Sequence, residues 1–473
     1  MQATAAPDAC EGIPPALADL ARWSAALAWA DVPEAVRARA ALVLLDDLGA
    51  LVAAREEPEL QGLRQRVAQS AGAPEATILD GGHTRLDRYS AALSNGAAAD
   101  WCELDGGYRP VVCHAALYCL PALLAEAEAT GASVREVLLA LVTGYEVIAR
   151  VGRCFTFPEL VLHPHGGFAT IGAAAAVAKL RKFDAQRTAD AINTAATVVL
   201  PGPFGHAIDG ALIRNVWPGL CAQNGIRVAD WVEIGITGTG TSLVDVFVTL
   251  FGADPAPEQL SGSLGASWAI LDGYHKIYAC CQYGHSTVEA LLEAIAEHGA
   301  PPAAADVESL RIETHPKGRK LDNANPATTL AAKFSIQHIA AATVHYGQAG
   351  QAAFSAAALA DPELTALRQR VAIAPFEPLP SAPNDRPARV TVTLRDGRVL
   401  RAECLSARGG PDRPFTSEEI LAKAARSLAG AYPGAAPSLL EIAALVPDVL
   451  RCAWKDRLTN FGATPSNAPA RGD

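Results

Sequence analysis

The 473-residue chain has few charged residues, and the basic ones are the minority among them. Lysine and arginine number 39 against 50 aspartates and glutamates, which gives a formal net charge of −11 at pH 7. Proteins that bind nucleic acids carry a basic patch or stripe, so this balance argues against a nucleic-acid partner. It leaves a small anionic ligand open, because a few cations in a cleft set the local field.

Long apolar runs are also missing. The most apolar stretches, such as "VREVLLALVTGYEVIARVG" at 134–152, are interrupted by Glu and Arg well short of a membrane span. The first residues, "MQATAAPDACEGIPPALADL", contain no basic segment followed by an apolar one. Half of all residues are hydrophobic, which is typical of a compact globular protein. We therefore expect a cytoplasmic protein with no membrane partner.

The sequence has none of the usual spacings of a metal site. Its ten cysteines contain no CxxC pair, and no HExxH motif is present. Scattered cysteines in a cytoplasmic protein are most simply reduced thiols buried as small hydrophobic residues. We therefore predict no metal and no cofactor.

Helical periodicity dominates the first part of the chain. Apolar spacing predicts helices over 33–54, over 133–152 with Ser133 as the N-cap, and over 166–184. The last of these is so rich in Ala and Gly that it must pack closely on its neighbours, which indicates a bundle around a buried central helix. We predict an all-helical domain over residues 1–270.

The pattern changes after residue 270. Alternation of β-branched residues predicts strands within 307–316 and 370–378, and a hairpin over 388–405 turns at an Asp-Gly pair. The predicted fold class is therefore mainly α, a large all-helical domain with an inserted smaller α+β lid domain. We place the lid domain at 271–410, helices that rejoin the helical domain at 411–460, and a disordered tail at 461–473.

A short stretch before a predicted helix raises the question of function. "KIYACCQYGHSTVEALLEA" at 276–294 brings a lysine, two cysteines and a histidine together. With it, several motifs resemble the MmgE/PrpD family in sequence and in order, from about residue 15 to residue 455. They are "SNGAAADWCELD" at 94–105, "LHPHGGFATIGAAAAVAKL" at 162–180, "GLCAQNGIRVADW" at 219–231 and "NPATTLAAKFSI" at 325–336.

The resemblance carries expectations about fold, partner and substrate. Members of the family include 2-methylcitrate dehydratase, cis-aconitate decarboxylase and iminodisuccinate epimerase. The resemblance implies a helical domain with an α+β lid, a homodimer, and action on a small di- or tricarboxylate without a metal.

Site residues are assigned through the same motifs. The resemblance implies catalytic roles for Glu103, His114, His163, Lys276 and His338, and substrate binding by Asp105, Arg214 and His285. His163 also precedes the Ala-rich helix, where free backbone N–H groups favour an anion. The residues alone leave plainer alternatives: a surface lysine, a helix-terminal His285, a solvated acidic turn and a loop histidine at 163. His165 is interpreted as incidental.

The acidic segment departs from the family pattern. Asp100 replaces a histidine, Glu103 replaces an aspartate, and Gly106-Gly107 replace an Asp and a Thr. Two glycines remove polar side chains and are expected to loosen the loop. Elsewhere Arg214 replaces a lysine, which permits a two-bond grip on a carboxylate. His338 replaces a tyrosine and is a better acid or base near neutral pH.

The leading functional hypothesis is a cofactor-independent lyase that dehydrates a citrate-like hydroxy acid, or hydrates the corresponding alkene. Such a site must stabilise a carbanion-like transition state with fixed cations and move protons with positioned groups. A decarboxylase of an aconitate-like acid and an epimerase of a dicarboxylate remain alternatives. A non-catalytic binding protein is the outsider.

Overall fold

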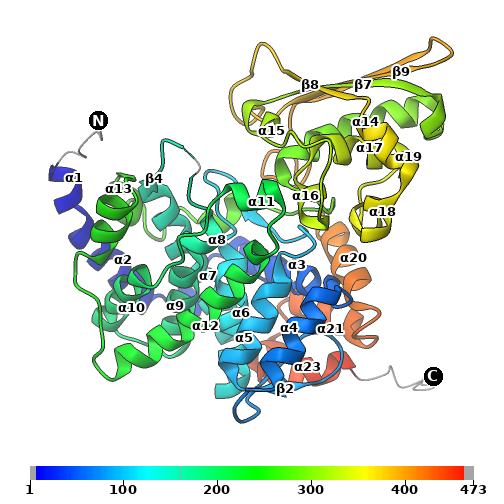
Figure 1. Ribbon diagram of the computed structural model, residues 1–473. Helices are drawn as coiled ribbons and strands as arrows, with labels where there is room; N and C mark the ends of the chain where they lie inside the picture. The colour runs from blue at the N-terminus through cyan, green and yellow to red at the C-terminus, as the bar shows by residue number, and fades with distance from the viewer. Residues whose placement is uncertain (1–6, 160, 463–473) are drawn as a thin grey trace, which may run out of the picture.

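A computed structural model describes residues 7–159 and 161–462. The chain is mainly helical, and the helices before residue 262 form one body (Figure 1). These helices are α2 (Ile13–Ala26), α3 (Glu34–Ala53), α4 (Pro58–Ala68), α5 (Arg88–Ala99), α6 (Ala115–Thr130), α7 (Val134–Cys154), α8 (Pro164–Gly167), α9 (Ala169–Leu180), α10 (Ala185–Thr197) and α12 (Ile213–Glu233). Short helices α1 (Pro7–Glu11), α11 (Gly205–Asp209) and α13 (Glu258–Ser261) lie between or beside them.

The centre of this body is α9. It packs against α6, α7, α10 and α12, and its residues 169–178 are buried. Small side chains let the helices approach closely: a Cβ built at Gly225 of α12 would lie 2.3 Å from the Cβ of Ala173 in α9. The predicted buried central helix is confirmed. The predicted single helix over 166–184 is instead two helices, because Phe168 leaves helical geometry with φ −120°.

The helix predicted over 133–152 is present as α7. Ser133 caps it in a reciprocal arrangement, in which its hydroxyl accepts from the Glu136 backbone N–H and the Glu136 carboxylate accepts from the Ser133 N–H. The helix continues through Gly152 to Cys154, two residues beyond the predicted end.

A four-stranded sheet follows in the chain, in the order β10-β9-β7-β8. Its strands are β7 (Val307–Thr314), β8 (Val371–Pro375), β9 (Ala388–Leu394) and β10 (Val399–Cys404). The β7–β8 pair is parallel and the other two pairs are antiparallel. The predicted strands are confirmed, and so is the hairpin, in which Val399 pairs with Thr393 and Cys404 with Ala388.

Helices cover one side of this sheet. α14 (His285–His298) packs on β9 and β10, and α17 (Ile336–Tyr346) packs on α14 and β8. Buried residues alternate along β9 because only one of its faces meets the helices. The shorter helices here are α15 (Pro316–Arg319), α16 (Thr329–Lys333), α18 (Ala356–Ala360) and α19 (Pro362–Arg368). In Figure 1 this α+β part stands above the helical body.

The chain then returns to the helical body. α20 (Ser417–Leu428) packs on α3, followed by α21 (Ala435–Ala443), α22 (Pro447–Arg451) and α23 (Trp454–Gly462). Phe461, assigned to the tail from the sequence, is fully buried in α23; residues 463–473 of that tail lie outside the described residues. The boundaries at 271 and 410, and a role of this segment as a lid, stay predictions.

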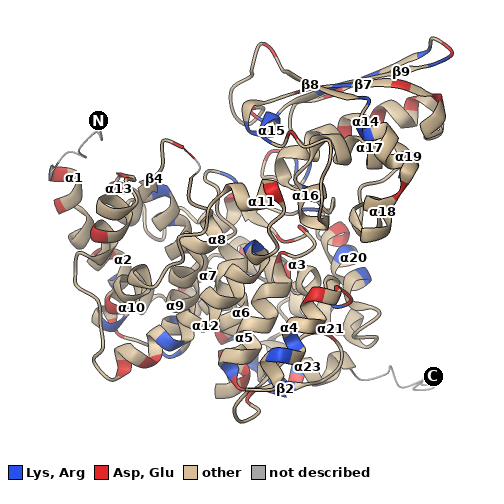
Figure 2. Cartoon of the chain, in the orientation of Figure 1, with Lys and Arg blue, Asp and Glu red and all other residues tan. Residues whose placement is uncertain are grey.

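Three two-stranded pairs tie loops to the body. They are β1 (Ala76–Thr77) with β2 (Arg85–Leu86), β3 (Gly107–Tyr108) with β6 (Gly273–Tyr274), and β4 (Phe155–Thr156) with β5 (Asp254–Pro255). Acidic and basic residues are interspersed over both parts of the molecule in the view of Figure 2. Among the helices of residues 7–159 and 161–462, none has the length and apolarity needed to cross a bilayer.

Candidate active site

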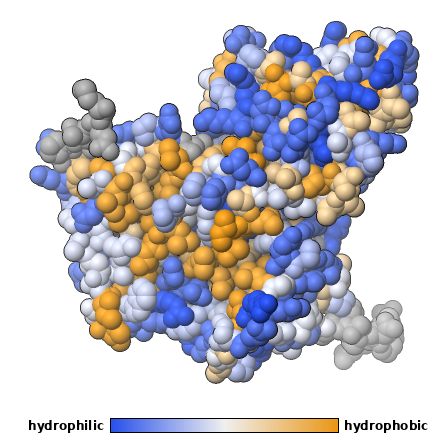
Figure 3. All heavy atoms as spheres, viewed as in Figure 1, coloured by the Kyte–Doolittle hydropathy of each residue, from blue (hydrophilic) through white to orange (hydrophobic). Residues whose placement is uncertain are grey.

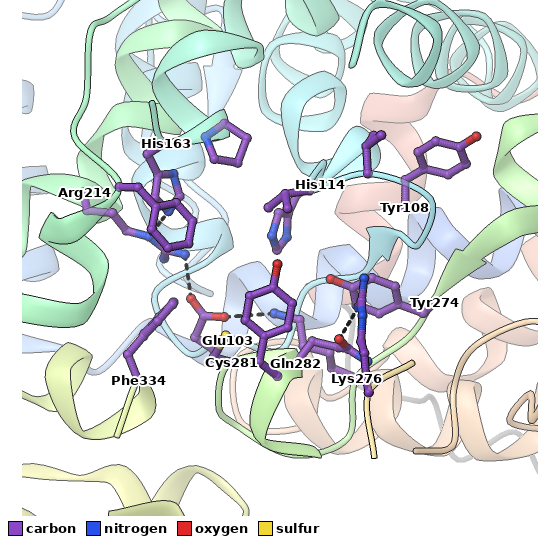
Figure 4. Close-up of a pocket in the computed structure, with 16 residues that line it drawn as sticks. Glu103, Tyr108, His114, His163, Arg214, Tyr274, Lys276, Cys281, Gln282 and Phe334 are labelled. Carbon is purple, nitrogen blue, oxygen red and sulfur yellow. Dashed lines mark hydrogen bonds and ion pairs between the residues drawn. The ribbon is translucent and has the colours of Figure 1, made fainter. Parts of the chain in front are cut away.

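A cavity with a solvent-accessible volume of about 40 Å³ lies where the helical body meets the α+β part (Figure 4). Its lining residues come from segments far apart in the sequence. They are Glu103, Tyr108, Val111, Val112, His114, His163, Pro164, Phe204, Arg214, Tyr274, Lys276, Cys281, Gln282, Tyr283, Phe334 and Arg386. Five of the eight residues assigned to the site from the sequence are among them.

A sharp turn after α5 presents the first of these side chains. Glu103 has φ +52°, an uncommon conformation for a residue with a side chain, and its N–H donates to the Asp100 carbonyl over 3.1 Å. Gly107 follows in β3 and pairs with Tyr274 of β6. A Cβ at Gly107 would lie 2.4 Å from the Tyr274 hydroxyl, so a larger residue does not fit.

The expectation that the two glycines loosen this loop is therefore wrong. The Gly106 N–H donates to the Asp47 Oδ1 atom over 2.8 Å, and Gly107 is held in a strand pair. Both glycines are buried. Their lack of a side chain lets the backbone approach Tyr274 and α3, which fixes the loop.

Ion pairs join Glu103 to two buried cations. Its carboxylate lies 2.8 Å from Arg214 Nη2 and 3.0 Å from Lys276 Nζ, and Figure 4 shows it between them. Lys276 Nζ also lies 3.1 Å from Asp105 Oδ1, and Arg214 Nη1 contacts Asp100. All five side chains are at most 2% exposed. Lys276, predicted to be catalytic, and Arg214, predicted to bind substrate, are thus both paired with carboxylates of the protein itself.

These contacts set the protonation of the carboxyl groups. Burial favours the protonated form of Glu103, but the charges of Lys276 and Arg214 outweigh it and hold its pKa below the ordinary value. Burial likewise opposes ionisation of Asp105, yet Lys276 and His114 bring its pKa well below the ordinary value. At Asp100 burial prevails, and its pKa is raised well above the ordinary value. The paired cations thus favour the ionised forms of Glu103 and Asp105, whereas burial favours the protonated form of Asp100.

His114 is oriented by Asp105. Its Nδ1 atom lies 2.5 Å from Asp105 Oδ2. An ionised carboxylate only accepts hydrogen bonds, so Nδ1 carries the proton. In the neutral ring the Nε2 atom then keeps its lone pair, and His114 lines the cavity. This is the arrangement of a general base with a carboxylate behind it.

His163 differs from His114 in the hydrogen bonds of its ring, because no carboxylate of the described residues orients it. It is the N-cap of α8, and its Nδ1 atom accepts from the His165 N–H over 3.2 Å. Arg214 Nε approaches its Nε2 atom to 3.3 Å. Burial, with Arg214 beside it, lowers the pKa of His163 well below the ordinary value, so the ring is neutral. A neutral imidazole has one lone pair, so one of these two contacts brings two N–H groups together.

His165, which was interpreted as incidental from the sequence, has a structural role. It lies fully buried, with Nε2 2.5 Å from Asp100 Oδ2 and Nδ1 3.0 Å from the Tyr118 hydroxyl. It therefore holds Asp100, which in turn contacts Arg214. His165 is the second histidine of the "HPHGG" motif, but its contact with Asp100, 65 positions away, cannot be predicted from that motif.

Two of the sequence-based assignments fall elsewhere in the structure. His285 begins α14, and its Nε2 atom contacts the Cys280 carbonyl at 3.1 Å. Burial, and next Lys276, lowers the pKa of His285 to about 3, so this ring is neutral. His338 lies on α17, where Ala353 O is 2.9 Å from Nε2 and Arg368 Nη1 is 3.0 Å from Nδ1. Protein groups occupy both nitrogens of His338.

The sequence also gave no warning of much of the cavity wall. Tyr283 and Gln282 lie inside the motif at 276–294, between the residues that drew attention there. Arg386 follows a loop that matches no motif and precedes β9. It faces the cavity only because the sheet packs beside residues 274–283.

One group of side chains has a geometry that a metal ion could use. Among residues 7–159 and 161–462, only Asp100, Asp105 and His114 offer three ligand atoms within 4.8 Å of one another. Arg214 and Lys276 already occupy the two carboxylates. A divalent cation would place its charge against both, so we assign no metal to this site.

A second layer of charge supports the loop from behind. Asp46 of α3 pairs with His275 at 2.6 Å and with Lys423 of α20 at 2.7 Å. Lys423 also donates to the Leu104 carbonyl over 2.6 Å. Helix α20 thus helps to fix the loop that carries Glu103 and Asp105.

The neighbouring Asp47 makes the stability of the fold sensitive to pH. Burial, followed by the charges of Asp46 and Asp105, raises the pKa of Asp47 to about 8. An unfolded chain releases this proton near pH 4, so the folded state loses relative stability as the pH rises from about 4 to about 8. We expect Asp47→Asn, which cannot ionise but can still accept from Gly106, to unfold several degrees higher than the wild type at pH 8.5.

Thermal unfolding at pH 5 and pH 8.5 measures this effect. The difference in melting temperature between Asp47→Asn and the wild type should be larger at pH 8.5 than at pH 5, because only the wild type has an ionisable group at position 47. The matched control is Asp412→Asn at an exposed aspartate. An advantage that is the same at both pH values would contradict the assignment.

Comparison with known proteins agrees with the fold and with the motif order. The MmgE/PrpD N-terminal domain matches residues 18–246, and the MmgE/PrpD C-terminal domain matches residues 278–446. The cis-aconitate decarboxylase-like protein oryM of Aspergillus oryzae is 25% identical over 437 residues, covering 86% of this chain and 89% of the relative. A cis-aconitate decarboxylase of Aspergillus terreus is 26% identical over 440 residues, covering 87% and 89%. The resemblance seen in the sequence is confirmed, and the chain belongs to the MmgE/PrpD family.

Proposed function

We propose that this chain is a cofactor-independent lyase that moves a proton at the carbon next to a carboxylate of a small acid. One observation carries the proposal: His114, a histidine backed by the Asp105 carboxylate, lines the same cavity as the cations Arg214 and Lys276. A carbon acid of this kind needs a base and a stabilised oxyanion together. The family and the relatives named as cis-aconitate decarboxylases support a lyase that acts on a carboxylate.

In the leading version the reaction is dehydration of a hydroxy acid. His114 Nε2 takes the proton from the carbon, and the electron pair moves toward the adjacent carboxylate. The positive charges of Arg214 and Lys276 stabilise the oxygen on which charge develops. The C–O bond then breaks, and the hydroxyl leaves as water with the proton that His114 held. Hydration of the alkene is the same path in reverse.

Decarboxylation is the second candidate, because two relatives carry that name. There the C–C bond to the leaving carboxylate breaks, and a protonated His114 delivers the proton to the carbanion. Epimerisation uses the same base and needs a second group that delivers a proton to the other face of the carbon. The α+β part, as a lid, would contribute Lys276, Gln282 and Tyr283 to each of these reactions.

Nuclear magnetic resonance in D₂O tests the proposal and separates its versions. The purified protein is incubated with citrate-like, aconitate-like and methyl-substituted dicarboxylic acids. Gain or loss of an alkene identifies a hydro-lyase, release of CO₂ a decarboxylase, and deuterium incorporation without net change an epimerase. Absence of turnover and of exchange with every acid would reject a catalytic role.

A homodimer is the expected assembly. Large apolar side chains are exposed on the helical body, among them Val161, Ile234, Ile236 and Leu250, each more than half exposed. Figure 3 shows apolar surface gathered across the middle of that body. Exposed apolar patches on a protein surface favour association with another chain. Light scattering at micromolar concentration should give twice the chain mass of 49.2 kDa, and a monomer mass would contradict the prediction.

A further inference from the structure

The charge balance of the cavity limits what it can bind. Lys276 contacts two carboxylates of the protein, and Arg214 contacts Glu103 and Asp100. The ionised forms of Glu103 and Asp105 cancel the two cations. A substrate therefore meets a cluster that is already close to neutral, and another cation must hold any further carboxylate.

Arg386 is that cation. It lines the cavity, it is 7% exposed, and it precedes β9. Its Nη1 atom donates to the Gln282 side-chain oxygen, and its Nη2 atom donates to the Arg109 carbonyl over 3.3 Å. The guanidinium also lies over the Tyr283 ring, with Cζ 5.3 Å from the ring centroid. These partners are neutral, so they fix the side chain without cancelling its charge.

Across the described part of the chain, no acceptor hydrogen-bonds to the buried Nε atom of Arg386. The nearest carboxylate, Asp385, lies 4.0 Å from Nε, is more than one third exposed and already pairs with Arg109 at 3.1 Å. A buried N–H without an acceptor is costly, and a ligand carboxylate would satisfy it.

The rest of the wall is largely apolar. Side chains of this kind are contributed by Tyr108, Val111, Val112, Phe204, Tyr283 and Phe334. Such a wall favours a short hydrocarbon substituent and offers no cation to a third carboxylate.

We infer that the substrate is a dicarboxylate with a small apolar substituent, and that Arg386 binds the carboxylate remote from the reacting carbon. This rests on the proposed function, in which the reacting carboxylate meets the charges of Arg214 and Lys276. It narrows the substrate class by excluding tricarboxylates such as citrate. Arg386 is thereby a specificity-determining residue rather than a proton-transferring one.

Three acids that share one carbon frame test the inference. In 2-methylbutanoate one carboxylate of 2-methylsuccinate is replaced by a methyl group, and in tricarballylate the methyl group of 2-methylsuccinate carries a third carboxylate. Calorimetric titration of the wild type should show 2-methylsuccinate binding at least about tenfold more tightly than either. Arg386→Gln should weaken 2-methylsuccinate by roughly 10- to 100-fold and 2-methylbutanoate by less than about threefold.

Arg389→Gln is the matched control, since Arg389 lies on β9 and pairs with Glu403 away from the cavity. It should change none of the three affinities, and thermal unfolding verifies that both variants are folded. The inference is overturned if Arg386→Gln weakens the mono- and dicarboxylate equally, if tricarballylate binds most tightly, or if none of the acids binds the wild type.

The same proteins separate this inference from the proposed function. Binding that depends on Arg386, without turnover or deuterium exchange of any acid, would reject the lyase function and support carboxylate binding by Arg386. Turnover of an acid with a KM that Arg386→Gln does not alter would reject carboxylate binding by Arg386 and support the lyase function. An increase in KM with kcat within a few-fold supports both.

Discussion

Replacement of Lys276 by methionine should lower the free energy of unfolding by about 3–5 kcal/mol and reduce kcat/KM by about 10²–10³-fold. Lys276 is fully buried, and its ammonium group lies 3.0 Å from Glu103 and 3.1 Å from Asp105. Methionine fills a similar volume but leaves two buried carboxylates without this cation. Each must then bind a proton or remain charged in an apolar setting, and both are costly.

The double variant Lys276→Met, Glu103→Gln isolates the charge effect. Removing one of the two carboxylates should restore part of the stability, because the pair interacts directly and its energies are not additive. Activity should not return. Lys320→Met, at an exposed lysine, controls for loss of a positive charge as such. Denaturant unfolding of Lys276→Met with an unchanged midpoint would show that the ion pairs contribute nothing to stability.

Replacement of His114 by asparagine should reduce kcat by about 10²–10⁴-fold while the fold remains intact. The asparagine amide can still donate toward Asp105, where His114 Nδ1 lies 2.5 Å away in the wild type. What it removes is the Nε2 lone pair, which is the proposed base. Because the supporting hydrogen bond can persist, the loss should appear in turnover and not in the melting temperature.

Deuterium exchange makes this prediction specific. The variant should lose exchange of the carbon-bound proton together with turnover, and the KM should change little. His298→Asn, at the last residue of α14, is the matched histidine control. Retained exchange in His114→Asn would transfer the role of base to another group, and the mechanism above would be wrong.

Much of the fold follows from local patterns in the sequence. The 3.6-residue spacing of α3 and α7, the Ser133 cap and the alternation in β9 are short-range properties, and the structure contains all of them. The Ala-rich α9 could be placed at the centre because its small side chains permit close packing. The ends of helices were predicted less well. The single helix predicted over 166–184 is α8 and α9 in the structure, since Phe168 leaves helical geometry.

Patterns in the sequence predicted only part of the site. The order of motifs indicated the family and directed attention to Glu103, His114 and Lys276, which line one cavity. It could not tell that Lys276 and Arg214 pair with carboxylates of the protein itself. Those partners lie more than 100 positions away, and no local periodicity carries that information.

The sequence by itself determined the family, the helical character and the set of residues able to do acid–base chemistry. Only the tertiary structure decided which of them face the cavity: His114 and His163 do, whereas His285 and His338 are held by other groups of the protein. It also brought Arg386 to the wall, from a segment without a motif. The reason is physical: a side chain's protonation and direction depend on its neighbours in space, and packing of distant elements supplies those neighbours.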